Sequence, residues 1–418
     1  MAGDLRKTGS VTVTPVSELA QSPELEYDAQ VDEWVRNAVK PNSDFSTLVE
    51  SLPGIYPSVV AESLHRQGGL EVSFGSSEKL LRLEGPTPHP RDGDWRFHPD
   101  SHQLFAKILA TVGARDVAIL ACPSLVAPLA KTARSLVLAD SNQQWRDWIS
   151  ATNVDASWGD VSLAAKRWPH RFDAAIMDPP WYPFEFARFL SVAAALLKDG
   201  ASLYVAFPSL GTRPGIRAER ERLLHTARRL GLAHVSTRRS VLRYATPFYE
   251  GCALAAAGLP ILAGWRHSDL VTFKRVSSGY TDQVEPHSER WLSTSYGRLH
   301  LRIKPTEQEQ GPCDPRLVPL LVGNVLPSVS QRDKRRDAIC VWTAGNSIFG
   351  CNATHACYEV ASATMHKGDP VKALETTLKR ALTDREITNV RELQAQLAQL
   401  EAREARLYDE MHEDQPRT

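Results

Sequence analysis

The 418 residues are 42% hydrophobic and 23% charged, a composition typical of globular domains rather than of fibrous or disordered chains. No run of about 18 apolar residues exists, which excludes a membrane-spanning helix, and the first residues lack an apolar signal segment, which favours the cytoplasm. Lysine plus arginine and aspartate plus glutamate balance at 49 each, so the net charge neither supports nor excludes a nucleic-acid partner.

Shifts in composition and pattern predict five segments along the chain. They are a polar, disordered leader over 1–40, a winged-helix-like unit over 41–90, a doubly wound α/β domain over 91–265, a strand-rich accessory extension over 266–365, and a C-terminal helix or coiled coil over 366–418.

The winged-helix-like unit is predicted from the order helix, helix, hairpin. Helical spacing covers 45–52 and 58–64, and alternating segments cover 70–74 and 79–83, with Gly75-Ser76-Ser77 as the turn between them. The second helical pattern offers only His65 and Arg66 as phosphate contacts, whereas DNA-reading helices usually carry several basic or amide residues. A docking or dimerisation role is therefore slightly favoured over DNA binding.

Short, nearly continuous apolar runs recur in the next part of the chain. They cover 117–120, 135–140, 172–178 and 201–207, and helical stretches such as 183–197 and 216–231 lie between them. Strands that are apolar on both faces and alternate with helices are typical of a parallel sheet covered on both sides. The sequence therefore predicts a doubly wound, Rossmann-like α/β domain.

The last third of the chain has weaker signals. We expect strands within 291–302 and 338–342, a loop over 325–336 with a basic end, and helix over 369–412. The basic end consists of Arg332, Lys334, Arg335 and Arg336, which are either phosphate contacts or a solvated loop. The heptad-like positions are Val390, Leu393, Leu397, Leu400 and Leu407, with Glu404 interrupting the seam. A coiled coil and a packed helical hairpin are equally compatible with this spacing.

Six cysteines are widely spread and form no C-x-x-C pair. Cys351, His355 and Cys357 are close in sequence but lack the spacing of common zinc sites, so reduced, buried thiols are the preferred interpretation and no metal site is predicted.

Polar and special residues follow the ends of the predicted parallel strands, where open α/β sheets bind their ligands. Ala121-Cys122-Pro123-Ser124 follows the first strand, Asp140 ends the second, Asp178 ends the third, and Pro208-Ser209 follows the fourth. A carboxylate at the end of the second strand suits a ribose diol, because it can accept two hydroxyl protons.

The strongest signal is Asp178-Pro179-Pro180-Trp181, followed by Tyr182. Two prolines fix the backbone and supply carbonyls with no competing N–H group. An Asp side chain and such a carbonyl can hold both hydrogens of an amino group, while an aromatic ring can stack on a planar base. This combination indicates a site for an amine.

At these residues the sequence resembles class I, S-adenosylmethionine-dependent methyltransferases with an Asp-Pro-Pro-(Tyr/Trp/Phe) signature, which methylate exocyclic or side-chain amines. The resemblance covers about residues 95–260 and is strongest at 172–182. The variant ending in Trp resembles enzymes that act on the N6 amine of adenine in RNA and their DNA-acting relatives. The resemblance implies an N-methyltransferase domain over 91–265 with S-adenosylmethionine as its cofactor.

The resemblance also implies individual roles. The catalytic set would be Asp178, Pro179, Pro180 and Trp181, with Asp178 and the Pro179 carbonyl orienting the amine. The cofactor set would be Ala121, Cys122, Pro123, Ser124, Asp140, Asp160 and Asp178, with Asp140 at the ribose and Asp160 near the adenine. The acceptor set would be Trp181, Tyr182, Phe207, Ser209 and Tyr249, and residues 248–251 would form a lip together with the loop over 325–336.

One departure from the family pattern is the loop after the first strand, where Leu120-Ala-Cys-Pro-Ser124 replaces the usual glycine-rich turn. A similar Cys-Pro-Ser turn resembles a branch that includes protein-lysine methyltransferases. Three functions therefore stay open: methylation of adenine N6 in nucleic acid as the first choice, methylation of a protein lysine or polyamine, and a non-catalytic scaffold. A homodimer or a partner protein would dock through the C-terminal helix.

Overall fold

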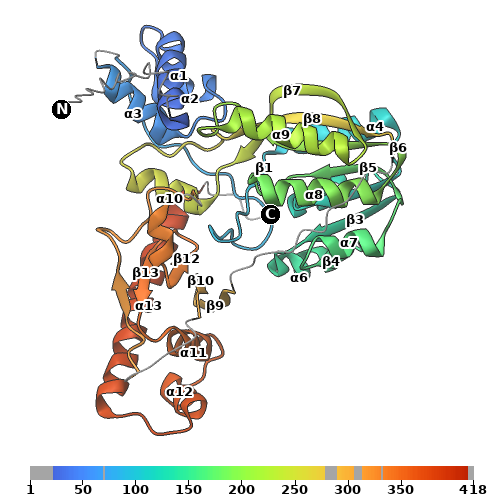
Figure 1. Cartoon of the computed structure of the whole chain (residues 1–418). Coiled ribbons are helices and arrows are strands. Elements are labelled where there is room, and N and C mark those ends of the chain that lie inside the picture. The colour runs from blue at the N-terminus through green and yellow to red at the C-terminus, as the bar shows by residue number, and fades with distance from the viewer. Residues whose placement is uncertain (1–21, 69–70, 278–289, 306–312, 331–332, 413–418) are drawn as a thin grey trace, which may run out of the picture.

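The computed structural model describes residues 22–68, 71–277, 290–305, 313–330 and 333–412. Figure 1 shows three parts: N-terminal helices, a central unit built around a large sheet, and a C-terminal part with a smaller sheet and helices. Among the described residues, no helix combines the length and the apolar character needed to cross a membrane. All six cysteines are free thiols.

The N-terminal part consists of α1 (Pro23–Ala38), α2 (Phe45–Ser51) and α3 (Pro57–Gln67). Helix α1 lies where the sequence predicted a disordered leader, and that prediction is wrong for these residues, whereas 1–21 lie outside the described part. Ser22 caps α1 by accepting a hydrogen bond from the Leu25 N–H, and Tyr27, Val31 and Val35 are buried at intervals of four. These three residues on an otherwise polar helix are too sparse a stripe for sequence patterns to reveal.

The predicted hairpin over 70–83 does not form in residues 71–83, and Leu70 lies outside the described part. Instead, Ser73 forms a bridge with Asp44 and Leu80 forms a parallel bridge with His412. The backbone groups of this segment are thus satisfied by distant parts of the chain, so the wing of a winged helix is absent here.

The central sheet has eight strands in the order β1-β7-β8-β6-β5-β2-β3-β4. The strands are β1 (Arg96–Phe97), β2 (Asp116–Leu120), β3 (Ser135–Asp140), β4 (Asp155–Trp158), β5 (Phe172–Met177), β6 (Leu197–Pro208), β7 (Leu232–Ala245) and β8 (His267–Arg275). Strands β4, β3, β2, β5 and β6 are parallel, and β8 is antiparallel to both β6 and β7. The predicted doubly wound sheet is confirmed in this core.

Helices connect these strands and flank the sheet. They are α4 (Pro99–Val112), α5 (Val126–Leu129), α6 (Arg146–Ser150), α7 (Ser162–Arg167), α8 (Pro183–Leu196), α9 (Ile216–Arg229) and α10 (Phe248–Ala256). Every residue of β2 is buried, as expected for a strand covered on both faces. Strands β3 and β4 lie on one side of β2, whereas β5 and β6 lie on its other side. The strand order therefore reverses at β2. Such a reversal opens a crevice at the carboxyl ends of the strands.

The C-terminal part has a five-stranded antiparallel sheet, β11-β13-β12-β10-β9, and three helices. Its elements are β9 (Leu292–Tyr296), β10 (Leu299–Ile303), β11 (Leu317–Pro319), β12 (Val341–Thr343), β13 (Ile348–Cys351), α11 (Thr354–Met365), α12 (Pro370–Leu378) and α13 (Asp384–Met411). Helix α13 begins with a capping box formed by Thr383 and Glu386.

The apolar seam of α13 packs inside its own chain. Val390, Leu393 and Leu397 are fully buried in one cluster with residues of β10, α11 and α12. Glu404, which interrupts the seam, accepts hydrogen bonds from Thr343 Oγ1 (2.5 Å), Ser347 Oγ (2.6 Å) and the Gly345 N–H (2.9 Å). Because the chain's own sheet covers this face, the coiled-coil interpretation and docking of a partner on the seam are not supported.

Helix α10 is the place where all three parts meet. Leu80, Phe248, Cys252, Ile261 and Met411 form one buried cluster, and the Leu80 N–H donates to the Met411 carbonyl. Figure 1 shows α10 between the central sheet and α13.

Candidate active site

The loop after β2 keeps the backbone shape of a glycine-rich turn without glycine. Ala121 has a φ of 55°, in the left-handed region that a non-glycine residue seldom adopts. Its N–H donates to the Ala139 carbonyl at 2.9 Å, which ties the loop to the end of β3. Pro123–Leu125 then form a single 3₁₀ turn. Local strain of this kind is characteristic of functional loops.

Cys122 turns into the core rather than toward the crevice. It is 3% exposed, and its thiol contacts the Leu120 carbonyl at 3.4 Å. Burial raises the pKa of this thiol, and the charges of Asp178 and Asp140 raise it further. The predicted cofactor contact of Cys122 is thus limited to its backbone, and the loop sits between two carboxylates.

Asp140 ends β3 and is buried. The Asn142 N–H donates to its Oδ1 at 2.7 Å, and no cation among the described residues forms an ion pair with it. Burial raises the pKa of Asp140 to about 7, with Asp94 and Asp92 adding to the effect. A carboxyl group without a cation is suited to neutral hydroxyl partners such as a ribose diol.

Asp160 follows β4 and is already engaged. Its Oδ1 accepts from the Ser162 N–H at 2.7 Å and pairs with Arg188 at 2.5 Å. Burial alone would raise the pKa of Asp160, but the bonds from Ser162 and Arg188 lower it. The structure therefore places Asp160 at the expected edge of the sheet but gives its carboxylate internal partners.

Asp178 lies next to the loop after β2, since its N–H donates to the Leu120 carbonyl at 3.1 Å. Tyr244, from β7, donates its hydroxyl hydrogen to Asp178 Oδ1 at 2.9 Å and also contacts Ser268 Oγ at 3.3 Å. Burial raises the pKa of Asp178 to about 7, and the Tyr244 bond and the Arg266 charge oppose that rise. The Tyr244 bond thus fixes the direction of the Asp178 carboxyl group. A pKa of about 7 allows this group to gain or lose a proton near neutral pH.

A stack of aromatic rings with an arginine inside it stands beside Asp178. The Arg266 guanidinium lies over both Trp95 and Trp181, 4.3 Å from each ring centroid, and 5.9 Å from the Tyr244 ring. Trp181 and Tyr244 meet edge to face at 6.0 Å. Planar cations between indole rings are held by cation–π attraction, so these rings form a cage suited to a positive charge.

The other predicted acceptor residues have different surroundings. Tyr182 lies 5.8 Å from the Arg213 guanidinium, and Arg213 also donates to the Trp181 carbonyl. Phe207 is completely buried against Phe186 and Arg220, so it supports the core rather than the crevice. Ser209 is 3% exposed, and its hydroxyl contacts Asp269 at 3.5 Å.

Tyr249 and its neighbour Glu250 lie in the first turn of α10 and are almost completely buried. Tyr249 meets Trp95 edge to face at 6.3 Å, which connects it to the arginine stack. The basic loop was predicted to face this segment. Val325, where that loop begins, packs beside the α10 cluster. However, Arg335 pairs with Asp333, Arg336 lies over Trp342, and Arg332 is outside the described residues.

The N-terminal helices pack against the loop that follows β6. The Tyr27 hydroxyl donates to the Gly211 carbonyl at 2.7 Å. Gly54 has a φ of 91°, and a Cβ there would lie 2.7 Å from Ser209 Cβ, so only glycine permits this approach. Arg66, one of the two expected phosphate contacts, pairs with Asp32 at 2.7 Å. These helices therefore pack beside the loop that follows β6.

Residues that the sequence did not single out complete the site: Trp95, Tyr244, Arg266 and Ser268. They come from the linker before β1, from β7, from the residue directly before β8 and from β8, far from Asp178 in sequence. Only topology brings them together, so no local motif could have revealed them.

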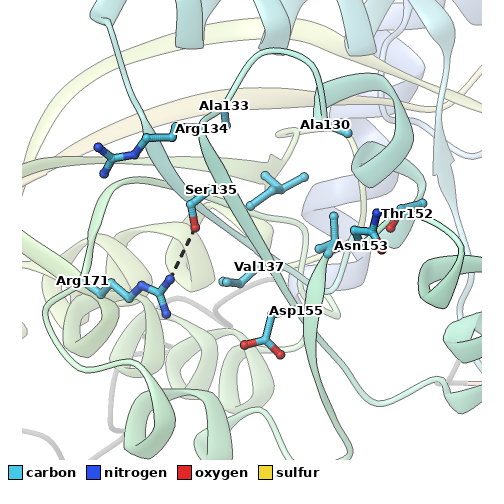
Figure 2. Close-up of a pocket in the computed structure, with 11 residues that line it drawn as sticks. Ala130, Ala133, Arg134, Ser135, Val137, Thr152, Asn153, Asp155 and Arg171 are labelled. Carbon is cyan, nitrogen blue, oxygen red and sulfur yellow. Dashed lines mark hydrogen bonds between the residues drawn. The ribbon is translucent and has the colours of Figure 1, made fainter.

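A surface hollow of about 290 Å³ lies elsewhere, at the start of β3 and β4. Figure 2 shows Ser135, Asp155 and Arg171 at its rim, with Arg171 reaching the Ser135 hydroxyl at 3.5 Å. It is at the opposite end of the strands from Asp140 and Asp178, and ligands of open α/β sheets bind at the carboxyl ends.

Comparisons with known proteins reveal the fold. The sequence matches no protein-family profile and no curated protein. The C9 mutein of the branched-chain polyamine synthase from Thermus thermophilus aligns with a TM-score of 0.50 and 15% identity, covering 63% of this chain and 95% of the synthase. The synthase itself gives 0.48 and 15%, covering 60% and 89%. The N-methyltransferase NodS from Bradyrhizobium japonicum gives 0.30 and 12%, covering 43% and 98%. The central part of this chain therefore has a doubly wound, Rossmann-like α/β fold, which it shares with the synthase mutein.

Proposed function

We propose that this protein transfers a methyl group from S-adenosylmethionine to an aliphatic amine nitrogen held by Asp178. The observation that carries the proposal is Asp178 itself, a carboxyl group fixed by Tyr244 at the strand reversal and flanked by the Trp95–Arg266–Trp181 stack. A protein lysine and a polyamine both present such an amine.

The residues at the carboxyl ends of β2 and β3 fit the donor. Asp140 has no ion-pair partner among the described residues, which leaves it for the ribose hydroxyls. The left-handed turn at Ala121 and the Ser124 hydroxyl would hold the amino-acid tail. When bound, the donor would supply an electrophilic methyl group on a sulfonium. A positive sulfonium also suits an edge of the sheet where the carboxyl groups of Asp140 and Asp178 both act on the loop after β2.

The protein's part in the reaction is orientation and charge stabilisation. Asp178 and the Pro179 carbonyl would hold the two N–H groups, so that the nitrogen lone pair points at the methyl group. An aliphatic amine arrives mainly as an ammonium ion, so Asp178 would first accept one of its protons and free the lone pair. The nitrogen would then replace the sulfur at the methyl group, and the donor would leave as a neutral thioether. Asp178 faces the positive charge that grows on nitrogen and can take up the released proton, because its pKa is about 7.

Methylation of adenine N6 is the second candidate, favoured by the Asp-Pro-Pro-Trp signature. Exposed arginines on α9 and β7 also offer phosphate contacts; they are Arg217, Arg222, Arg228, Arg238 and Arg239. An adenine ring would need an aromatic face, however, and Arg266 covers the face of Trp181. An amine acceptor fits beside this stack without removing the arginine.

The test is a donor and acceptor screen read by mass spectrometry. S-adenosylmethionine is supplied with lysine-containing peptides, polyamines, adenine-containing RNA and DNA in parallel. A second arm uses decarboxylated S-adenosylmethionine, because the Thermus synthase was crystallised with N4-aminopropylspermidine and 5′-methylthioadenosine. We expect a mass gain of one methyl group on an amine. Transfer only to nucleic acid would favour methylation of adenine N6. A mass gain of one aminopropyl group would contradict methyl transfer and identify an aminopropyl group as the one transferred.

Asp178→Asn tests the role of the carboxylate. We expect the transfer rate to fall at least about 100-fold, because charge stabilisation and proton uptake are both lost. Calorimetry should show S-adenosylhomocysteine binding within about threefold of the wild type. Asp173→Asn is the matched control, since Asp173 lies in the same strand but at its other end, paired with Lys198. Wild-type turnover by Asp178→Asn would contradict the assignment.

A further inference from the structure

Behind the arginine stack lies a group of buried polar atoms without hydrogen-bond partners in the described part of the chain. They are both carboxylate oxygens of Glu250, the hydroxyls of Tyr56 and Tyr249, and the Trp265 indole nitrogen. Glu250 is 0% exposed, Tyr249 1% and Trp265 3%. Native proteins seldom leave such atoms unpaired, because each costs free energy. Five of them in one cluster indicate a ligand site.

These side chains pack together and continue from the stack beside Asp178. Trp95 meets Trp265 edge to face at 5.9 Å and Tyr249 at 6.3 Å. Tyr56 meets Trp265 at 5.1 Å, and its hydroxyl faces the Glu250 carboxylate. The Glu250 carboxylate thus lies among aromatic rings next to the stack.

Charge in this region is unbalanced. Arg266 is the one cation, among the described residues, whose charge acts on Asp178 and on Glu250. When both carboxyl groups are ionised, one positive charge is therefore shared by two carboxylates. A single additional cation would balance the site, and an ammonium group could also pair with the Tyr56 and Tyr249 oxygens.

Glu404 shows what a buried carboxylate looks like when its role is structural. It is equally buried, but it accepts three hydrogen bonds, from Thr343, Ser347 and Gly345. Glu250 has only the Tyr56 hydroxyl facing it, and neither of its oxygens forms a hydrogen bond of good geometry with the described residues. The difference separates a carboxylate that holds the fold from one whose partner comes from outside.

We infer that Glu250, Tyr56 and Tyr249 bind a second ammonium group of the acceptor, so that the substrate is a diamine or a longer polyamine. The inference rests on the proposed function, in which Asp178 holds the reacting nitrogen. Tyr56 belongs to the N-terminal helices, so this part of the chain contributes directly to acceptor recognition.

Amine series of matched length test the inference with the full-length protein. Transfer to 1-aminobutane, 1,4-diaminobutane and spermidine is measured for the wild type, Glu250→Gln and the control Glu404→Gln. We expect Glu250→Gln to raise KM for the two polyamines at least about tenfold, with kcat and the KM for 1-aminobutane little changed. Glu404→Gln should leave the ratio of KM values unchanged. An equal effect of Glu250→Gln on monoamine and diamine would overturn the inference and leave the proposed function standing.

Thermal unfolding gives an independent measure that needs no turnover. We expect 1,4-diaminobutane to raise the melting temperature of the wild type but not of Glu250→Gln. Without any amine, Glu250→Gln should be at least as stable as the wild type, because it removes an unpaired buried charge. If the diamine stabilises the wild type but no group is transferred to it, the proposed function is contradicted, whereas the inferred ammonium site at Glu250 is supported. No stabilisation of the wild type would overturn the subsite.

Discussion

Asp140, Asp178 and Glu250 share an unusual property: burial raises the pKa of each to about 7. Glu386 shows the opposite behaviour, because its hydrogen bonds to Arg380 hold its pKa far below the ordinary value. Asp140 and Asp178 flank the loop after β2, and Glu250 lies beside the arginine stack, whereas Glu386 caps a helix. Perturbed titrating groups gathered in one place are characteristic of functional sites.

The raised pKa of Asp178 predicts the pH dependence of transfer. The ionised carboxylate is the form that stabilises a growing positive charge, so activity should rise with pH and level off above about 7. The neighbours that set this pKa are Tyr244, which donates to the carboxylate, Arg266, and Trp181. The measurement is kcat/KM between pH 5.5 and 8.5. Tyr244→Phe removes a bond that lowers the pKa and should move the rise to higher pH.

Stability gives a separate check on the same group. The folded pKa of Asp178 lies above its ordinary value of 3.8, so the folded state binds more protons than the unfolded state between these values. Ionisation then opposes folding as the pH rises through this window. The free energy of unfolding of Asp178→Asn, relative to that of the wild type, should therefore increase as the pH rises from about 4 to about 7. Urea titration measures this difference at each pH. A gain that does not depend on pH would argue against the raised pKa.

The sequence predicted the site residues that directly follow parallel strands, and it missed those that arrive from elsewhere. Asp140 and Asp178 were found because the ends of neighbouring parallel strands meet at one edge. Tyr244 lies on β7 and Arg266 directly precedes β8, two strands with antiparallel pairing, and Trp95 lies in a linker. Their convergence depends on strand order, which local spacing does not encode.

At the scale of elements, the contact between the N-terminal helices and the loop after β6 depends on Gly54. We expect Gly54→Ala to lower the free energy of unfolding by about 1–3 kcal/mol, because a left-handed backbone and a clash with Ser209 act together. Urea unfolding measures the loss. Gly93→Ala is the matched control, since Gly93 also has a positive φ but open space around it, and it should cost less.

Helix α13 is anchored to the small sheet by Glu404. We expect Glu404→Ala to lower the free energy of unfolding by about 3–5 kcal/mol, because three donors lose their acceptor inside the protein. Glu410→Ala, in an exposed pair with Arg406, should change it by less than about 1 kcal/mol. Equal effects of the two substitutions in denaturant titrations would contradict the anchoring role.

The parallel core was predictable because its strands are apolar throughout, and α2 and α3 were predictable from their spacing. Helix α1 and the segment over 71–83 were not. Only three buried residues mark α1, and the alternating pattern that suggested a hairpin instead pairs with Asp44 and His412. Alternation shows that a segment can form strand-like bonds, but not which segment supplies the partner.

At the scale of the whole molecule, the cluster around Leu80 joins the segment after α3, helix α10 of the central part and the end of α13. We expect Leu80→Ala to cost about 2–4 kcal/mol and to split a single unfolding transition into two, because the shared core is weakened. Differential scanning calorimetry tests this. Leu326→Ala is the control, since Leu326 is equally buried but packs only within the C-terminal part. It should lower stability without separating the transitions.

The bond between the Leu80 N–H and the Met411 carbonyl also has a consequence for the order of folding. Its partners are 331 residues apart in sequence, as are the neighbouring residues Lys79 and Glu410. At about 5–20 residues per second, a ribosome needs roughly 20–70 s to make the chain between them. The surface of α10 that receives α13 stays exposed during this time, so nascent chains would be vulnerable to aggregation there.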